Sequence, residues 1–221
     1  MSKAPPQVPD RLSLTEAEDP WLTWAREVQS IGQSGLHWQR DEFDKERYEQ
    51  LLAISADMMA ALADGTPPPF KRIFLEQTGH ATPKVDIRGV VFRDDKVLLV
   101  KEILDGCWSM PGGFADVGRS AAEVVVKELA EESGFQVRAD RLLAVYDRAR
   151  HGHSHSAFHM YKLFFACEII GGEATGGMET TEVDFFDLDN LPELSAGRIT
   201  VRQIHRMHEL YYDPAAPTEF D

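Results

Sequence analysis

The stretch MPGGFADVGRSAAEVVVKELAEESGF, residues 110–135, decides the fold, because it joins a glycine-rich turn to a helix with recognisable ends. Ser120 followed by Glu123 is a Ser-x-x-Glu capping box, which satisfies free N–H groups at a helix start. Gly134 can take the left-handed conformation that closes a helix. The stretch therefore predicts a turn followed by a helix that begins near Ala121 and ends before Gly134.

Three glutamates of this helix, Glu128, Glu131 and Glu132, have the spacing i, i+3, i+4. That spacing places their carboxylates on one helical face, where like charges repel by roughly 0.2–0.5 kcal/mol per pair and only Lys127 offers local relief, through Glu131. A divalent cation would replace this repulsion by attraction, whereas the alternative is an ordinary solvated acidic face. The Pro-Gly-Gly turn at 111–113 favours the cation, since glycine lets backbone carbonyls approach a metal or a phosphate.

The glycines and glutamates also form one longer pattern. It resembles the signature of the Nudix hydrolases: Gly, five residues, Glu, seven residues, Arg-Glu, an aliphatic residue, any residue, Glu-Glu, any residue, Gly and an aliphatic residue. The matching positions are Gly113, Glu128, Leu129, Glu131, Glu132 and Gly134, with Phe135 as the apolar end. Two positions depart from it, because Arg119 stands where the family has Glu and Lys127 where it has Arg. So many fixed positions at fixed spacings make the match specific.

The resemblance covers about Pro83 to Tyr211 and implies a fold: a Nudix-type α/β/α sandwich with a mixed sheet, here preceded by an N-terminal helical hairpin. Such a hairpin ahead of the domain resembles a bacterial subgroup labelled ADP-ribose pyrophosphatase-like or CDP-choline pyrophosphatase-like. The implied activity is metal-dependent hydrolysis of the diphosphate bond in a nucleoside diphosphate linked to another moiety, such as ADP-ribose, CDP-choline or a nucleotide sugar, with release of a nucleoside monophosphate. The alternative is a non-catalytic nucleotide-binding module with a degenerate Nudix site, because Arg119 and Lys127 depart from the signature.

Oxygen ligands without histidine or thiolate suit Mg²⁺ or Mn²⁺. The expected metal-binding set is the Gly113 carbonyl with Glu128, Glu131 and Glu132. A carboxylate must also accept the proton of the attacking water. The candidates are Glu131, Glu132 and two residues that precede a predicted strand, Glu179 and Glu182, for which a solvated turn is the alternative.

Basic residues supply candidates for substrate binding. Arg88 interrupts an apolar strand, so it either pairs with a core carboxylate, Asp86 being on the same strand face, or is presented to phosphate. Arg148, His151 and His153, followed by His155, lie in a loop that could close over the substrate, with a solvated loop as the alternative. Arg119 could hold a substrate phosphate, replace part of the metal charge, or pair with Asp116 or Glu123 in solvent.

The 221 residues contain 43% hydrophobic residues, enough for a substantial core, and carry a formal charge of −14. That charge opposes binding to DNA and to anionic lipid, so small phosphate-bearing substrates are favoured. The two cysteines provide no disulfide framework, which favours a reducing, cytoplasmic location. We expect no targeting segment and no membrane span.

Composition and helix-end signals separate a flexible arm (1–18) from a helical hairpin (19–69), and the resemblance implies a Nudix domain over 70–221. Asp19-Pro20 should cap a first helix with an apolar stripe of Trp24, Val28 and Ile31 that ends at Gly35. A second helix is expected from about Asp44 to Ala63. Its apolar and small-residue face consists of Leu51, Leu52, Ser55, Met58, Met59 and Leu62. Because the hairpin has more aromatic surface than it can bury alone, it should pack against the following domain or a second subunit, and we expect a homodimer interface.

The domain should alternate strands and helices. Expected strands are 84–92, 96–101, 141–148, 157–170 and 183–188, with Arg93-Asp94-Asp95 as a hairpin turn between the first two. A second capping box, Thr200 with Gln203, should open a last helix over 201–211.

Overall fold

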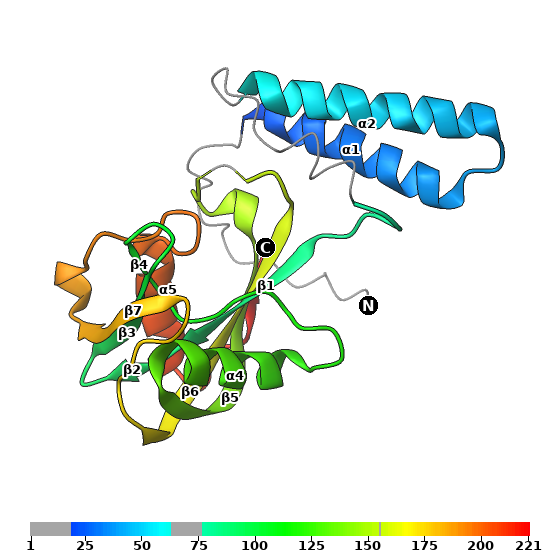
Figure 1. Cartoon of the computed structure of the whole chain (residues 1–221). Coiled ribbons are helices and arrows are strands. Elements are labelled where there is room, and N and C mark those ends of the chain that lie inside the picture. The colour runs from blue at the N-terminus through cyan, green and yellow to red at the C-terminus, as the bar shows by residue number, and fades with distance from the viewer. Residues whose placement is uncertain (1–18, 63–76, 155) are drawn as a thin grey trace, which may run out of the picture.

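The computed structural model describes residues 19–62, 77–154 and 156–221. Two antiparallel helices, α1 (Pro20–Trp38) and α2 (Glu42–Leu62), form a hairpin beside an α/β domain (Figure 1). The predicted arm 1–18 and the predicted boundary between residues 69 and 70 lie outside the described residues. Among the described helices, none combines the length and the apolar character needed to span a bilayer.

The domain contains two four-stranded sheets. The mixed sheet has the order β1-β6-β5-β8, in which β1 pairs with β6 in parallel, β6 with β5 antiparallel and β5 with β8 in parallel. In the antiparallel sheet β3 pairs with β2, β4 and β7. The bounds are β1 Lys84–Val90, β2 Phe92–Arg93, β3 Lys96–Glu102, β4 Trp108–Ser109, β5 Phe135–Asp147, β6 Met160–Gly172, β7 Thr180–Phe186 and β8 Glu219–Phe220.

In the described part of the Nudix-like α/β domain, the helices α4 (Ala121–Ser133) and α5 (Val201–Tyr212) pack on different hydrophobic clusters. Helix α4 buries Val125 and Leu129 against Ile87 of β1. Helix α5 buries Ile204 and other residues against Phe164 of β6 on the opposite face. Alternate residues of a strand point to opposite faces, so one strand contributes to both cores. The predicted α/β/α sandwich with a mixed sheet is therefore confirmed.

The strand predictions differ from the structure mainly at their ends. The expected strand 84–92 is interrupted at Val91, because β1 pairs within the mixed sheet whereas β2 pairs with β3. The predicted turn is confirmed, with Asp94 and Asp95 at φ 54° and 60°, the two positive values that a tight type I′ hairpin requires. The short strands β4 and β8 were not predicted, since two residues carry no detectable periodicity.

In the hairpin, the Asp19 cap is confirmed, because its side chain accepts a hydrogen bond from the backbone N–H of Trp21 at 2.9 Å. The predicted helix end at Gly35 is wrong. A Cβ at this position would lie 2.3 Å from the Tyr48 ring of α2, so Gly35 permits close helix packing instead of ending the helix. The apolar stripe is present but faces solvent, with Trp24 48% and Ile31 57% exposed.

The second helix has the expected extent within about two residues, and Leu52, Ser55 and Met59 of its predicted face are buried. Leu62 of that face is exposed. The Ser55 hydroxyl donates to the Ala25 carbonyl at 2.8 Å, which locks the two helices together.

The hairpin also contacts the α/β domain. The Arg26 guanidinium donates to the Ser156 carbonyl, and the Gln33 amide to the carbonyls of Thr78 and Gly79. A small hydrophobic cluster that includes Leu22 and Met59 packs against Phe158. These contacts hold the polar side of α1 against the domain.

Candidate active site

The ends of α4 are those that the sequence predicts. Ser120 accepts from the Glu123 N–H, and the Glu123 carboxylate accepts from the Ser120 N–H, so both halves of the capping box are formed. Gly134 closes the helix at φ 73°. The helix therefore begins immediately after the glycine turn and presents its glutamates to that turn.

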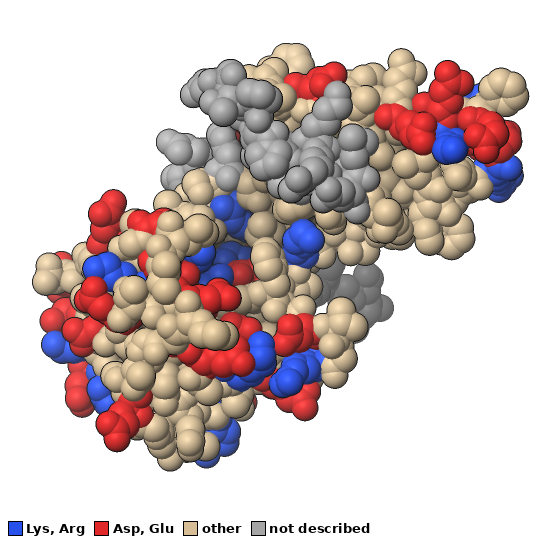
Figure 2. Space-filling view, viewed as in Figure 1, with Lys and Arg blue, Asp and Glu red and all other residues tan. Residues whose placement is uncertain are grey.

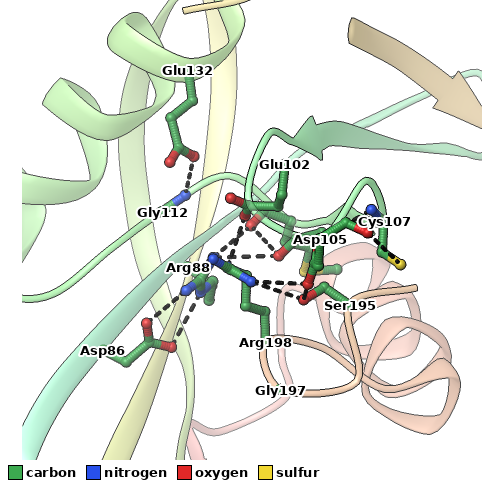
Figure 3. Close-up of polar contacts among 12 residues, drawn as sticks. Asp86, Arg88, Glu102, Asp105, Cys107, Gly112, Glu132, Ser195, Gly197 and Arg198 are labelled. Carbon is green, nitrogen blue, oxygen red and sulfur yellow. Dashed lines mark hydrogen bonds and ion pairs between the residues drawn. The ribbon is translucent and has the colours of Figure 1, made fainter. Parts of the chain in front are cut away.

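Glu132 is the most deeply buried of the three glutamates, with 6% of the residue exposed. Its carboxylate accepts a hydrogen bond of 2.7 Å from the Gly112 N–H (Figure 3). A Cβ at Gly112 would lie 2.0 Å from the Ile87 carbonyl oxygen, and φ is +141°, so this approach requires glycine. Burial raises the pKa of Glu132 to about 7, against the opposing effects of the Gly112 hydrogen bond and the Arg88 charge.

Glu128 and Glu131 are linked by the Lys127 ammonium. Its Nζ lies 3.4 Å from Glu128 Oε1, 3.3 Å from Glu131 Oε2 and 3.2 Å from Asp116 Oδ2. The predicted relief of Glu131 by Lys127 is confirmed, and Asp116 of the preceding loop is a partner that the sequence analysis had not placed there. Burial raises the pKa of Glu128, whose side chain is 15% exposed.

The three carboxylates share one helix face, but they do not converge on one point. Glu132 turns inward to Gly112, whereas the Glu131 side chain is 57% exposed. Within residues 19–62, 77–154 and 156–221, no set of three His, Cys, Asp or Glu side chains is arranged to hold a metal. The donor chemistry nevertheless fits a hard divalent cation, because carboxylate oxygens are its preferred ligands and this face already surrounds one positive charge, the Lys127 ammonium.

The Gly113 carbonyl, the fourth predicted metal ligand, accepts a hydrogen bond from the Ile87 N–H at 2.8 Å. A carbonyl oxygen has two lone pairs, so this bond leaves one of them available. A Cβ at Gly113 would lie 3.2 Å from Glu128 Oε2, which places this residue next to the glutamate face.

Arg88 adopts the first of its two predicted arrangements. Its guanidinium pairs with both carboxylate oxygens of Asp86, at 3.1 and 2.7 Å, and also donates to the Ser109 hydroxyl and the Met110 carbonyl. Lys162 of β6, which the sequence analysis missed, forms a second ion pair with Asp86. Lys162 is a charged residue within an apolar strand, as Arg88 is. The same signal that singled out Arg88 could therefore have identified Lys162 as a candidate for a buried ion pair.

This buried cluster connects to the glutamate helix through Arg88. The charges of Asp86, Glu132 and Glu102 all raise the pKa of Arg88 against the opposing effect of its burial. Figure 3 shows the guanidinium between Asp86 and Glu102. Glu102 is 4% exposed and pairs with Arg198 Nε at 3.0 Å. The acidic site therefore borders a network of buried charges of both signs.

Of the two later carboxylates, Glu182 lies on β7 and Glu179 lies in the bend immediately before this strand. Glu182 pairs with Lys101 at 2.7 Å, and its side chain is 57% exposed. Glu179 is also exposed, and its charge contributes to raising the pKa of Glu102, for which burial is the main cause. Of these two, Glu179 is the one that acts electrostatically on the buried cluster, and the assignment of either as the base remains a prediction.

The basic loop is held by the C-terminal part of the chain. Arg148 is 5% exposed and donates to the carbonyls of Gly197 and Ser154. His151 stacks on Tyr146 and lies 2.9 Å from an Asp221 carboxylate oxygen, and His153 Nδ1 lies 3.0 Å from the Ala196 carbonyl. His155 lies outside the described residues. Substrate binding by Arg148, His151 and His153 remains a prediction.

Arg119 extends from the loop before α4, with its side chain 51% exposed and Nε 3.8 Å from Asp116 Oδ2. Its charge also contributes to lowering the pKa of Glu123, after the Ser120 hydrogen bonds. The structure thus shows the loose, exposed pairing that was one of its three predicted arrangements.

Comparison with known families gives two matches. Residues 19–74 match a family described as "UDP-X-like, N-terminal oligomerisation domain". Residues 82–206 match the NUDIX domain family. The chain belongs to the Nudix family. It is a Nudix hydrolase, an enzyme class that acts on nucleoside diphosphates linked to another group.

Individual relatives agree with this membership. A Bacillus subtilis protein provisionally named ADP-ribose pyrophosphatase is 40% identical over 208 residues, which cover 94% of this chain and all of the relative. The solved structure of an ADP-ribose pyrophosphatase from Streptococcus suis matches over its whole length and covers 63% of this chain. The two are 40% identical, with a TM-score of 0.59. The solved structure of a UDP-X diphosphatase matches over 98% of its length and covers 91% of this chain. The two are 31% identical, with a TM-score of 0.60.

Proposed function

We propose that this Nudix hydrolase cleaves the diphosphate bond of a nucleoside diphosphate linked to a sugar, such as ADP-ribose or a nucleotide sugar, and releases a nucleoside monophosphate. The observation that carries the proposal is the Glu128, Glu131 and Glu132 face beside the Gly112-Gly113 turn. The names of two relatives that cover most of this chain, one for ADP-ribose and one for UDP-linked compounds, support the substrate class.

The proposed cofactor is Mg²⁺ or Mn²⁺, held by the Gly113 carbonyl, Glu128, Glu131 and Glu132. Such a cation neutralises the diphosphate and lowers the pKa of a water molecule. The protein's part is to orient these carboxylates and to accept a proton. Glu131 and Glu132, the latter the most buried of the three glutamates, are the proposed proton acceptors on this helix, with Glu179 and Glu182 as the other candidates.

A substrate panel tests the proposal. The purified protein is incubated with Mg²⁺ or Mn²⁺ and, separately, ADP-ribose, UDP-linked sugars, CDP-choline and dinucleoside polyphosphates, and the products are separated by chromatography. We expect a nucleoside monophosphate from the sugar-linked diphosphates, and none when EDTA is present. Turnover of CDP-choline or dinucleoside polyphosphates alone would reject the sugar-linked class, and no turnover of any compound would favour the non-catalytic alternative.

Arg119 provides a second prediction, because it places a cation where the family signature has a carboxylate. We expect Arg119→Glu to bind more Mg²⁺ or Mn²⁺ per chain and to change how the rate depends on metal, since it replaces repulsion by attraction. Arg119→Ala should chiefly raise KM. Calorimetric metal titration and rate measurements check both variants, and unchanged values in both would leave Arg119 as only an exposed partner of Asp116.

We further propose that the enzyme is a cytoplasmic homodimer joined through its hairpin. The exposed apolar side chains of the hairpin include Trp21, Trp24, Ile31, Trp38 and Phe43, more than a monomer usually leaves in one region. Figure 2 shows that charged side chains gather at the free end of the hairpin, where α1 and α2 join. The family description of residues 19–74 as an oligomerisation domain supports the assembly. Both cysteines are free thiols, as expected in a reducing compartment.

The variant Trp24→Asp/Ile31→Glu tests this interface. Each replacement puts a charge on the exposed stripe, so we expect a monomer by light scattering, with helicity unchanged because neither residue is buried. Leu104→Glu is the matched control, since Leu104 is 83% exposed on the Nudix domain. A monomeric wild type, or a dimer that survives both stripe changes, would contradict the assignment.

A further inference from the structure

A groove of about 1130 Å³ lies between the hairpin and the Nudix domain. One wall is a single polar face of α1, formed by Thr23, Arg26, Glu27, Ser30 and Gln33. Their spacing of i, i+3, i+4, i+7 and i+10 is that of one helical face. This face is separate from the buried face of Leu22 and Ala25, which packs on α2, and from the exposed stripe of Trp24 and Ile31.

The opposite wall comes from the glycine turn. Phe114 and Val117 line the groove, and Phe114 is 54% exposed. The backbone there is fixed, because Phe114 bridges Asp86 and the Ala115 N–H donates to the Val85 carbonyl at 2.9 Å. Phe114 is thus an exposed aromatic residue on a rigid loop, an arrangement that suits stacking against a flat ring.

The same loop joins the groove to the glutamate face. Gly113 precedes Phe114, and a Cβ on it would lie 3.2 Å from Glu128 Oε2. A diphosphate bound through the proposed cation at Glu128 would therefore have the groove as its neighbour on the side of Phe114. The groove also offers hydrogen-bonding groups, among them Gln29, His80 and His159.

We infer that this groove binds the nucleoside half of the substrate, with the base against Phe114 and the polar face of α1 as the second wall. The inference rests on the proposed function and extends it: the hairpin is part of the substrate site as well as an assembly element. Stacking suits the base better than the sugar, because every base has a flat π-face and a sugar has none.

Two variants test the groove from opposite sides. Ser30→Trp fills it from α1, and Phe114→Ala removes the stacking surface from the loop. Glu49→Trp, at an exposed position of α2 outside the groove, and Ile170→Ala, 61% exposed on β6, are the matched controls. Binding of AMP, UMP, CMP, GMP, ribose 5-phosphate and glucose 1-phosphate is measured by calorimetry, and KM is measured for the best substrate of the panel.

We expect Ser30→Trp to weaken binding of the preferred monophosphate at least tenfold and Phe114→Ala about fivefold or more, with KM rising in parallel and both controls behaving as wild type. Circular dichroism should show unchanged folding. If hydrolysis occurs but monophosphate affinity is unchanged in both variants, or if only ribose 5-phosphate or glucose 1-phosphate binding is affected, the groove assignment is wrong while the proposed function stands. Loss of monophosphate binding in an enzyme that hydrolyses none of the panel would support the groove and reject the function.

Discussion

Glu131→Gln and Glu132→Gln are each expected to lower metal-dependent turnover by at least about 100-fold, the range in which carboxylates that act in proton transfer contribute. Glutamine keeps the shape of the side chain but removes the negative charge that would hold a divalent cation and accept a proton. Glu132→Gln can still accept the hydrogen bond of the Gly112 N–H, so the glycine turn should stay in place. Turnover is measured against metal concentration for each variant.

The fold should survive these changes. Removing one of several like charges from a helix face stabilises the metal-free helix slightly. At position 132, glutamine also avoids the cost of burying a charged carboxylate. We therefore expect an equal or slightly higher Tm without metal, and a smaller rise of Tm on adding Mg²⁺ than in wild type. Glu168→Gln, exposed on β6, is the control for losing one carboxylate. Wild-type activity in the double variant Glu131→Gln/Glu132→Gln would contradict the site.

Asp86→Asn should cause the largest loss of stability, because it leaves two buried cations without their common counter-charge. Arg88 and Lys162 are 4% and 1% exposed and both pair with Asp86. Removing one partner of a buried pair costs about 3–5 kcal/mol. At roughly 2–4 °C per kcal/mol for a chain of this size, Tm should fall by about 10 °C. Asp140→Asn, in an exposed pair with Arg138, should cost less than about 1 kcal/mol.

The pH dependence of stability tests the ion pairs of Asp86 with Arg88 and Lys162 independently. Burial alone would raise the pKa of Asp86, but Arg88 and Lys162 outweigh it and lower the pKa from 3.8 to about 2. The folded-state pKa is below the unfolded one, so the stability from Asp86 is complete above about pH 4 and is lost as the pH falls toward 2. Denaturant unfolding between pH 5 and 2 should show this loss in wild type and a smaller one in Asp86→Asn. If the free energy of unfolding fell equally with pH in wild type and in Asp86→Asn, Arg88 and Lys162 would not be keeping Asp86 charged.

Local signals predicted the helix that carries the candidate site and much of the fold. The capping residues Ser120 and Glu123, the Gly134 end and the Glu128, Glu131 and Glu132 spacing depend on groups within a few positions of each other. The family signature is also local, and it implied the α/β/α arrangement. Such patterns can be read without tertiary structure, because hydrogen bonds and side-chain directions within one helix repeat in every helix.

Tertiary contacts decided what those patterns left open. Nothing near Gly35 indicates that the Tyr48 ring will cover it and let the helix continue, and nothing near Arg88 indicates a lysine 76 positions beyond Asp86 in the same ion-pair cluster. Glu132 is buried and Glu131 is exposed, although both belong to the same helix face. The sequence by itself determined which residue types share a face. Only packing between distant segments decided which of them are buried, which charges are paired, and where the groove between α1 and the Phe114 loop lies.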